Sequence, residues 1–570
     1  MPVSSKITIQ ESKTPQQIVE QILSLRGISD LQTFLSPPAI NDDFFTRVTQ
    51  LFGDELMGAV EQIRHAISQN TPIIIHGDYD VDGVSATAIL WETIYYDLSY
   101  ENVRPFIPHR VDHGYGLSKA SIDDITSQLL ARDQKPGLLI TVDCGITAKD
   151  SVSYAHECGY SVIVTDHHTR PENETDLPTT SSTLHSYKLC GAGVSWVLSR
   201  AIVKDRKQSE SKDMTQADYE KGIDLVALAT LADIQELTDC NRSLVTYGLK
   251  KLTNTSRSGL LSLYQQAGIV GKPIGTYEVG WVIAPRLNAT GRLDHALDAL
   301  RLLVVRDHSK ARDLSQKLDD LNATRQQMTT EALTQAHEMV AVEWNRMSPI
   351  VVYGKDWHEG IIGLIAGKLA EKYKVPVLAI AGSNEGAKGS ARSIIGVNIV
   401  EILRRFDDVF ETMGGHSQAA GFSLSLEHVE ILKQHIAQID LASEFNLDAT
   451  HDVEVEVSIP ISLVTLELCE ELAKIEPFGV GNSRPTFVSR NVVVSDMRAV
   501  GKTNSHLKLR FSDSQEIVQV DGIGFGLAQE HKQLSVGDVV DVVYSIEKNE
   551  FNGRVSAQMK VDKLLVAIDQ

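Results

Sequence analysis

Short apolar runs that each end in an acidic or histidine cluster restrict the possible fold more than any other feature of this sequence. They are PIIIHGDYD from Pro72, GLLITVDCG from Gly137 and SVIVTDHH from Ser161. Runs of this kind are typical of buried parallel strands. Helical patterns over 84–96 and 146–158 separate them, so the order predicts an open α/β sheet with a parallel core. Ligands bind at the carboxyl ends of such strands, where the polar clusters fall here.

The chain of 570 residues is too long for one hydrophobic core, so we expect several domains. A stretch poor in Gly and Pro predicts long connecting helices before a second α/β unit that begins at Pro349. After Thr450, short alternating segments predict a small β-barrel. The predicted parts are an N-terminal segment (1–50), a catalytic domain (51–294), a helical connector (295–345), a second α/β domain (346–445) and a barrel domain (450–570).

Charge and composition exclude some classes of protein. A net charge of −21 argues against coating nucleic acid by bulk attraction, although a local basic groove stays open. The five cysteines are scattered and never form a C-x-x-C pair, which argues against disulfides and against a thiolate zinc site. The sequence lacks an apolar leader and any run of roughly 20 apolar residues, so we expect a cytoplasmic protein without membrane contact.

The strongest chemical signal is HGDYDVDG, which follows the first apolar run. His76, Asp78, Asp80 and Asp82 alternate along it, so in an extended segment their side chains would point the same way. Like charges this close repel, whereas a divalent ion would turn repulsion into coordination. A lone D-x-D motif would more often be an acidic surface turn.

Further clusters weaken that alternative. Asp143, the triplet Asp166, His167 and His168, and Asp233 each follow another apolar segment, and we expect them to converge at one edge of the sheet. Mixed carboxylate and imidazole ligands favour Mn²⁺, with Mg²⁺ as a substitute. The surplus of ligands predicts two ions about 3.5 to 4 Å apart, an arrangement typical of phosphoester hydrolysis.

These motifs resemble a known family. HGDYDVDG, VDCG, TDHH and ATLAD resemble, in order and spacing, the motifs of the DHH phosphoesterases, and the second lobe resembles the DHH-associated domain. The segments IPHRVDHGYGL, LCGAGVSW, APRLNATGRLD and EPFGVGNSRPTF favour the RecJ branch. The resemblance covers nearly the whole chain. It implies a metal-dependent 5′-to-3′ exonuclease that degrades single-stranded DNA by two-metal phosphodiester hydrolysis, in DNA repair and recombination.

The resemblance also implies roles for individual residues. One ion would be held by His76, Asp80 and Asp143, and the other by Asp82, Asp143, His167 and Asp233. Asp143 would bridge the two ions. His168 would contact the scissile phosphate, and Asp78 would orient a ligand, so that Asp143, His168 and Asp78 form the implied catalytic set.

Two short motifs of the second lobe point to phosphate binding. Taken singly, GSAR (389–392) and GGH (414–416) would more often be tight turns. By resemblance, both lie over the metal site. The implied substrate contacts are a 5′-phosphate pocket of Arg110, Ser390 and Arg392, further contacts from Arg286 and Arg292, and the phosphate-binding residues Gly414, Gly415 and His416.

A basic stripe crosses the predicted barrel. Its members are Arg484, Arg498, Lys502, Lys508 and Arg510. With aromatic residues nearby, such a stripe suits the groove of an OB-fold that binds single-stranded nucleic acid. The alternative is a solvated β face, because the rest of the barrel is acidic.

Two other functions stay open at this point. One is a DHH-family phosphodiesterase that acts on short oligonucleotides or cyclic dinucleotides, and the other is a non-catalytic replication scaffold. The added barrel argues against the first, and the complete metal motifs argue against the second. By resemblance we expect single-stranded DNA with a 5′ end, a helicase and a single-strand binding protein as partners of a monomer.

Overall fold

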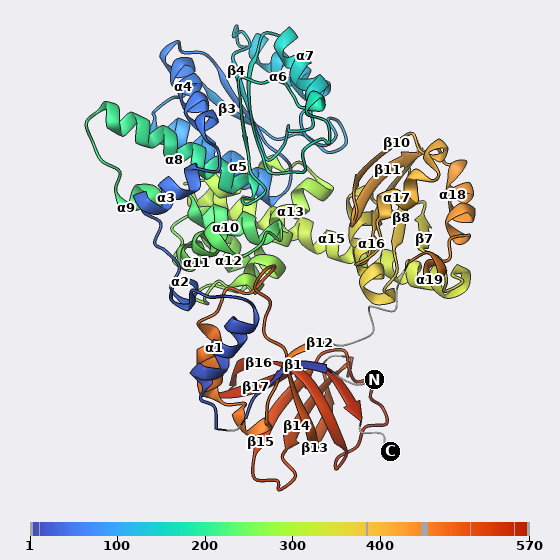
Figure 1. The fold of residues 1–570 in the computed structure, drawn as a ribbon. Coiled ribbons are helices and arrows are strands. Elements are labelled where there is room, and N and C mark those ends of the chain that lie inside the picture. Colours follow the sequence, from blue (N-terminus) through green and yellow to red (C-terminus); the bar gives the residue numbers. More distant parts are fainter. Residues whose placement is uncertain are drawn as a thin grey trace. The chain divides into compact units, whose positions relative to one another are not determined.

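The computed structural model describes residues 4–10, 12–383, 386–445, 454–501, 503–551 and 553–566. It divides into two compact units. The larger contains residues 40–235 and 247–448, and the smaller contains 1–39, 236–246 and 449–570. Figure 1 shows the elements of both units. None of the described helices is long and apolar enough to cross a membrane.

The first sheet of the larger unit is parallel throughout, as the sequence predicts. Its strands are β2 (Ile73–His76), β3 (Val103–Phe106), β4 (Leu138–Val142), β5 (Ser161–Asp166) and β6 (Ser182–His185). They lie in the order β3-β2-β4-β5-β6. The three apolar runs of the sequence are therefore the adjacent central strands, and their carboxyl ends meet at one edge.

The helices of this domain are α3 (Asp42–Thr49), α4 (Asp54–Ser68), α5 (Val81–Glu92), α6 (Lys119–Leu130), α7 (Lys149–Glu157), α8 (Gly191–Ser209), α9 (Gln216–Glu220) and α10 (Ile223–Ala232). Of these, α4, α5, α7 and α8 pack on strands of the sheet. The helix predicted over 84–96 begins earlier, at Val81, because Asp80 caps it by accepting hydrogen bonds from the amides of Asp82 and Gly83. It continues as a π-helix, η1 (Thr93–Asp97). The segment before Asp233, which the sequence leaves open as a strand or a buried segment, is helix α10.

The predicted connector, residues 295–345, is helical, and it contains the last two of the elements that follow α10. The elements that follow α10 are α11 (Asp239–Thr253), α12 (Ser258–Ala267), the π-helix η3 (Glu278–Ile283), α13 (Ala284–Leu293), α14 (Leu297–Val304) and the long α15 (His308–Glu343). Asp307 caps α15 through a hydrogen bond from the amide of Lys310. Segment η3 runs directly into α13, so residues 278–293 form one continuous helical segment.

A second, mixed sheet follows α15. Its elements are β7 (Ile350–Gly354), α16 (Glu359–Tyr373), β8 (Val377–Ser383), β9 (Gly386–Arg392), α17 (Ile399–Arg404), β10 (Thr412–His416), β11 (Ala419–Leu424), α18 (His428–Ala437) and α19 (Leu441–Glu444). The strand order is β10-β11-β9-β8-β7, and only β7 and β8 are parallel. Helix α16 packs on β8 and β9. The predicted second α/β domain is confirmed.

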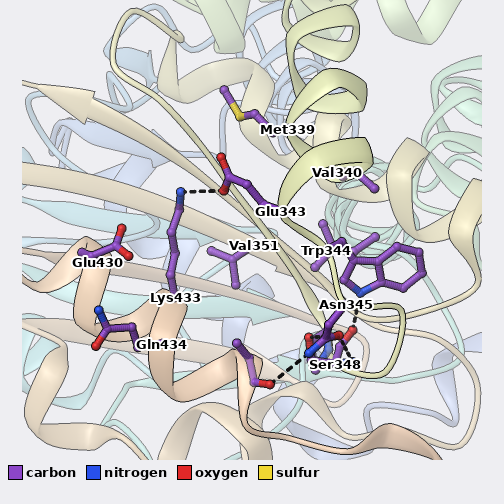
Figure 2. A pocket seen from close by; sticks show the side chains of 13 residues that line it. Met339, Val340, Glu343, Trp344, Asn345, Ser348, Val351, Glu430, Lys433 and Gln434 are labelled. Atoms are coloured by element: carbon purple, nitrogen blue, oxygen red, sulfur yellow. Dashed lines mark hydrogen bonds and ion pairs between the residues drawn. The ribbon is translucent and has the colours of Figure 1, made fainter.

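This domain has a cavity of about 490 Å³ beside the end of α15, between β7 and α18 (Figure 2). Lys433 of α18 and Glu343 of α15 form an ion pair of 3.2 Å across it. The Trp344 indole donates to the Ser348 carbonyl at 2.8 Å and fixes the turn that leaves α15. None of the residues that the sequence predicts for the site lines this cavity.

The smaller unit is built around a closed β-barrel. Its elements are β1 (Ser4–Thr8), α1 (Pro15–Leu25), α2 (Leu31–Leu35), β12 (Glu454–Ser458), α20 (Leu466–Ala473), β13 (Phe487–Val500), β14 (His506–Ser512), β15 (Gln519–Gly524), β16 (Val539–Phe551) and β17 (Arg554–Val566). Strands β13-β14-β15-β17-β16 pair in turn, and the pairing of β13 with β16 closes the barrel. β1 pairs with β12, and α1 shares the barrel's hydrophobic core.

Candidate active site

The acidic and histidine clusters converge at the carboxyl edge of the first sheet. Three groups of side chains have potential metal-ligand atoms within 4.8 Å of one another. The groups are Asp78 with Asp80 and Asp143, Asp143 with His167 and His168, and Asp82 with His167 and Asp233. Asp143 belongs to two groups and His167 to two, so the three groups form one continuous cluster.

Backbone geometry brings Asp143 into the centre of this cluster. Its φ of +61° lies in the left-handed region, which Asp tolerates better than most residues. Gly191, the first residue of α8, lies against it, because a Cβ on Gly191 would come within 2.5 Å of the Asp143 Cβ. A larger residue at 191 would therefore displace Asp143.

The start of α8 also holds a second carboxylate. The amides of Gly191 and Ala192 each donate to an oxygen of Asp82 at 2.7 Å. The Nε2 atom of His167 lies 3.5 Å from Asp82 Oδ2, 3.1 Å from Asp143 Oδ1 and 3.7 Å from Asp233 Oδ2. One imidazole nitrogen thus faces three carboxylates at once.

The buried carboxylates fit a cation. Oδ1 of Asp78 and Oδ1 of Asp143 are buried without a hydrogen-bond partner, even though His167 lies close to Asp143. Burial raises the pKa of Asp82 to about 6, and it raises the pKa of Asp143 and Asp78 well above their usual range. Negative charge in so little water is costly unless a cation neutralises it. These buried oxygens, which accept no hydrogen bond, and the mixed carboxylate and imidazole donors therefore suit divalent metal ions.

His76 takes a different position from the carboxylates. It is fully buried, its Nε2 lies 3.2 Å from Ser121 Oγ, and its Nδ1 lies 3.8 Å from Cys144 Sγ. Burial lowers the pKa of His76 to about 4, so the ring is neutral at physiological pH, as a metal ligand must be. It belongs to none of the three groups, and Asp78 stands with Asp80 and Asp143 instead. The role of His76 as a ligand stays a prediction.

His168 is held at both of its ring nitrogens. Nδ1 lies 2.8 Å from Asp166 Oδ1, and Nε2 lies 3.0 Å from the hydroxyl of Tyr115. Although burial lowers the pKa of His168, its hydrogen bond and attraction to Asp166 raise it to about 9. The imidazole is therefore protonated at neutral pH and can stabilise negative charge.

Sequence reasoning missed three residues that support the cluster. The Gln235 amide donates to Asp233 Oδ2 at 2.7 Å and lies 3.2 Å from Nδ1 of His167. Asn288 of α13 accepts from the amide of Val81, inside the first acidic motif, at 3.1 Å. Tyr115 is the third. Gln235 stands two residues after a predicted ligand, and Tyr115 and Asn288 stand in the segments IPHRVDHGYGL and APRLNATGRLD, but the sequence patterns gave none of the three a role.

Four of the predicted substrate-binding residues line one cavity of about 460 Å³. They are Arg110, Arg292, Ser390 and Arg392, and Tyr79 and Tyr115 line it as well. Arg110 lies over the Tyr79 ring at 4.5 Å. The cavity receives side chains from the first acidic motif, from α13 and from β9.

The charge in this cavity suits an anion. The pKa of Arg292 is lowered to about 10. Burial is the main cause, and repulsion from Arg110, Arg325 and Arg392 adds to it. Arg392 is half-buried, which lowers its pKa, and its guanidinium donates to the Ser390 hydroxyl at 3.2 Å. An anionic ligand would relieve this crowding of positive charge, and arginine binds phosphate through paired hydrogen bonds.

Other predicted substrate contacts lie outside this cavity. Arg286 pairs with Asp319 of α15 at 2.8 Å. Gly414, Gly415 and His416 lie on the edge strand β10, which contributes only Thr412 to the cavity lining. Gly414 is two strands from Ser390 in the same cross-strand row, through Gly421. The roles of Arg286 and of these three β10 residues stay predictions.

On the barrel, the predicted basic stripe is divided. Arg498, Lys508 and Arg510 line one cavity of about 820 Å³ together with Arg554, which the sequence did not single out. Arg484 lies in a different cavity, where it stacks over Phe478 at 4.7 Å. Lys502 falls outside the described residues. The cavity of 820 Å³ therefore collects three of the five predicted residues.

Models of three protein families match separate parts of the chain. A model of the N-terminal domain of the DHH family matches residues 72–230. The DHHA1 domain matches residues 346–439, and the RecJ OB domain matches residues 455–563.

The chain is also similar to curated proteins and to a solved structure. It is 33% identical to the single-stranded-DNA-specific exonuclease RecJ of Haemophilus influenzae, over 90% of each chain. It is 32% identical to the exonuclease of that name from Bacillus subtilis, over 89% of this chain but only 63% of the relative. A crystal structure of RecJ in complex with Mn²⁺ from Thermus thermophilus matches with a TM-score of 0.76 at 28% identity, covering 97% of this chain and 76% of the other.

Proposed function

Because the chain belongs to the RecJ family, we propose that it is a metal-dependent exonuclease that degrades single-stranded DNA from a 5′ end. The observation that carries this proposal is the cluster around Asp143, whose buried carboxylate oxygen accepts no hydrogen bond and fits a divalent cation. The named relatives act on single-stranded DNA, and the solved relative binds Mn²⁺. The physiological context that we propose is DNA repair and recombination.

Two Mn²⁺ ions, or Mg²⁺ in their place, would occupy the cluster. The proposed ligands are His76, Asp80, Asp82, Asp143, His167 and Asp233. Bound metal would supply an activated water and would neutralise phosphate charge. Asp78, which lies among the carboxylates of the first group, would orient a ligand or bind the ion directly.

The chain's own residues stabilise the reacting phosphate. Asp166 fixes the protonated ring of His168, whose Nε2–H can donate to a phosphate oxygen once it leaves Tyr115. This hydrogen bond would strengthen as charge grows on the phosphate in the transition state. His168 therefore acts as an electrostatic stabiliser and no covalent enzyme intermediate is needed.

Polarity would come from the arginine-lined cavity. A terminal 5′-phosphate bound by Arg110, Ser390 and Arg392 would set the distance from the strand end to the scissile bond. Arg292 would add charge at the same place. The basic residues that line the barrel cavity would hold the rest of the strand.

The experiment is digestion of single strands labelled at the 5′ or the 3′ end, with and without Mn²⁺. We expect metal-dependent release of short products from the 5′ end first. Turnover of cyclic dinucleotides alone would favour a small-substrate phosphodiesterase, and metal-independent binding without cleavage would favour a scaffold. We also propose a cytoplasmic monomer that works with a helicase and a single-strand binding protein.

A further inference from the structure

Two large aromatic side chains lie in solvent on the helical segment that leads to the metal cluster. Tyr277 is 65% exposed and Trp281 is 75% exposed. They are four residues apart, so their rings lie on one face of the segment. A Cβ on Gly280, next to Trp281, would meet nothing within 4 Å, so the surface around the indole is open. Exposed aromatic surface of this kind marks a binding site more often than a lone exposed aliphatic residue does.

The exposed face continues to the metal cluster. Pro285 and Asn288 follow Trp281 at intervals of four and three residues, and both are partly exposed. Asn288 accepts a hydrogen bond from the amide of Val81 in the first acidic motif. The stripe that begins with two aromatic rings therefore ends at the backbone turn that carries the metal ligands.

The same segment reaches the anion cavity at its other end. Arg292, one turn beyond Asn288, lines the cavity of 460 Å³. At about 1.5 Å of rise per residue, Arg292 lies about 6 Å from Asn288 along the helix axis. Trp281 lies about 10 Å from Asn288 in the other direction along the same axis. One continuous helix thus places three features in order: the anion cavity, the metal cluster and the aromatic face.

We infer that Trp281 and Tyr277 form a stacking platform for the nucleobases that lie 3′ of the scissile bond. The inference rests on the proposed function, because a 5′-phosphate at Arg292 and a scissile bond at the metal cluster direct the strand toward Trp281. Every base offers a flat π-face to an aromatic ring, so the platform would bind single strands of any sequence. Paired bases are already stacked on each other, so a duplex could not use these rings in the same way.

The first test measures binding without cleavage. A 5′-phosphorylated 12-mer of thymidine, titrated in chelator, should bind Trp281→Ala about 10-fold more weakly than the wild type, the loss expected for one stacked base. Trp281→Phe should recover most of the affinity. The melting temperature of each variant checks the fold, which the removal of an exposed side chain should leave unchanged.

The second test separates stacking from backbone contact. Single abasic nucleotides are placed one position at a time along the 12-mer. At one or two positions just beyond the scissile bond, the abasic change should weaken binding to the wild type but not to Trp281→Ala. Equal affinity of Trp281→Ala and the wild type for the intact strand would overturn the platform. So would an abasic effect of the same size in both proteins.

Failure of the platform and failure of the proposed function are distinguishable. Mn²⁺-dependent cleavage of a short 5′-phosphorylated dinucleotide by the wild type tests the function without a long strand. If the dinucleotide is cleaved while Trp281→Ala binds the 12-mer normally, only the platform is wrong. If the wild type cleaves neither substrate with Mn²⁺ present, the proposed function is wrong.

Discussion

The hydroxyl of Tyr115 lies 3.0 Å from Nε2 of His168, so in the free protein this phenol occupies the nitrogen that, in the proposed mechanism, would donate to the phosphate. Tyr115 stands between two glycines in the left-handed region, Gly114 with φ of +77° and Gly116 with φ of +68°. Most residues with a side chain would be strained at these two positions. The sequence GYG thus allows a sharp turn that brings the phenol to the imidazole.

The first prediction concerns that contact. Tyr115→Phe removes the hydroxyl and keeps the ring, so Nε2 of His168 no longer has to leave a partner before it contacts the phosphate. We expect kcat/KM for single-stranded DNA to rise about 5-fold, the factor that corresponds to one competing hydrogen bond of about 1 kcal/mol. Steady-state kinetics with Mn²⁺ measure both constants.

A matched control is Tyr154→Phe. The Tyr154 hydroxyl donates to Asp123 at 2.7 Å, away from the cluster, so this change also removes one hydroxyl hydrogen bond. It should leave kcat/KM unchanged. If both variants keep the wild-type kcat/KM, Tyr115 does not compete with the phosphate for His168.

The second prediction uses the backbone of Asp143. Asp143→Asn removes the charge, and Asn tolerates a positive φ, so this variant should fold normally. Asp143→Ala should be less stable, because Ala is strained at a φ of +61°. Both should lose at least ~100-fold in activity. In the Asn variant, Mn²⁺ should raise the melting temperature much less than in the wild type. Wild-type activity of Asp143→Asn at saturating Mn²⁺ would contradict the assignment of Asp143 as the bridge.

The third prediction is a pH dependence of stability in chelator. The pKa of His168 is raised to about 9, so the folded state binds its proton more tightly than the unfolded state. This stabilisation is complete below pH 6.5 and is lost as pH rises through 9. The melting temperature should therefore fall between pH 6.5 and 9. In His168→Gln the fall should be smaller, and an identical fall in both proteins would show that other groups cause it.

The fourth prediction tests the cavity on the barrel. Charge removal by Arg498→Ala with Lys508→Ala should weaken binding of single strands and reduce the slope of log K against log salt by about 0.7 for each lost phosphate contact. Arg484→Ala is the control, since Arg484 lines a different cavity. A salt slope that changes only in Arg484→Ala would move the binding groove to that other cavity.

Much of the fold could be predicted because its signals are local. The apolar runs that end at His76 and Asp166 each fix a strand and its carboxyl end. The association of β1 with the barrel could not be predicted, because Ser4 pairs with Glu454, far away in the sequence. No local pattern encodes which strand such a segment joins.

Prediction of the site from the sequence also stops where contacts between distant residues begin. Its carboxylates and histidines stand in dense motifs and were all located from the sequence. Supporting residues such as Asn288 and Tyr115 act through one hydrogen bond each, to partners 207 and 53 residues away. Arg286, by contrast, stands in the segment APRLNATGRLD, but its guanidinium forms an ion pair with Asp319. Motifs reveal which groups have the right chemistry, and tertiary packing decides which of them face the site.

The last prediction concerns recognition of the 5′ end, and Arg286 supplies its control. Arg392 lines the anion cavity, whereas Arg286 lies outside the cavity lining and pairs with a carboxylate. Arg392→Ala should raise KM for 5′-phosphorylated strands by the loss of a charge-assisted hydrogen bond, about 1.5 to 3 kcal/mol or roughly 10- to 150-fold. It should matter much less for strands with a 5′-hydroxyl. Measuring both strands with both proteins gives a cycle whose coupling energy isolates the contact from any general loss of stability. Arg286→Ala should affect the two strands equally, and a coupling near zero for Arg392→Ala would mean that another group reads the 5′ end.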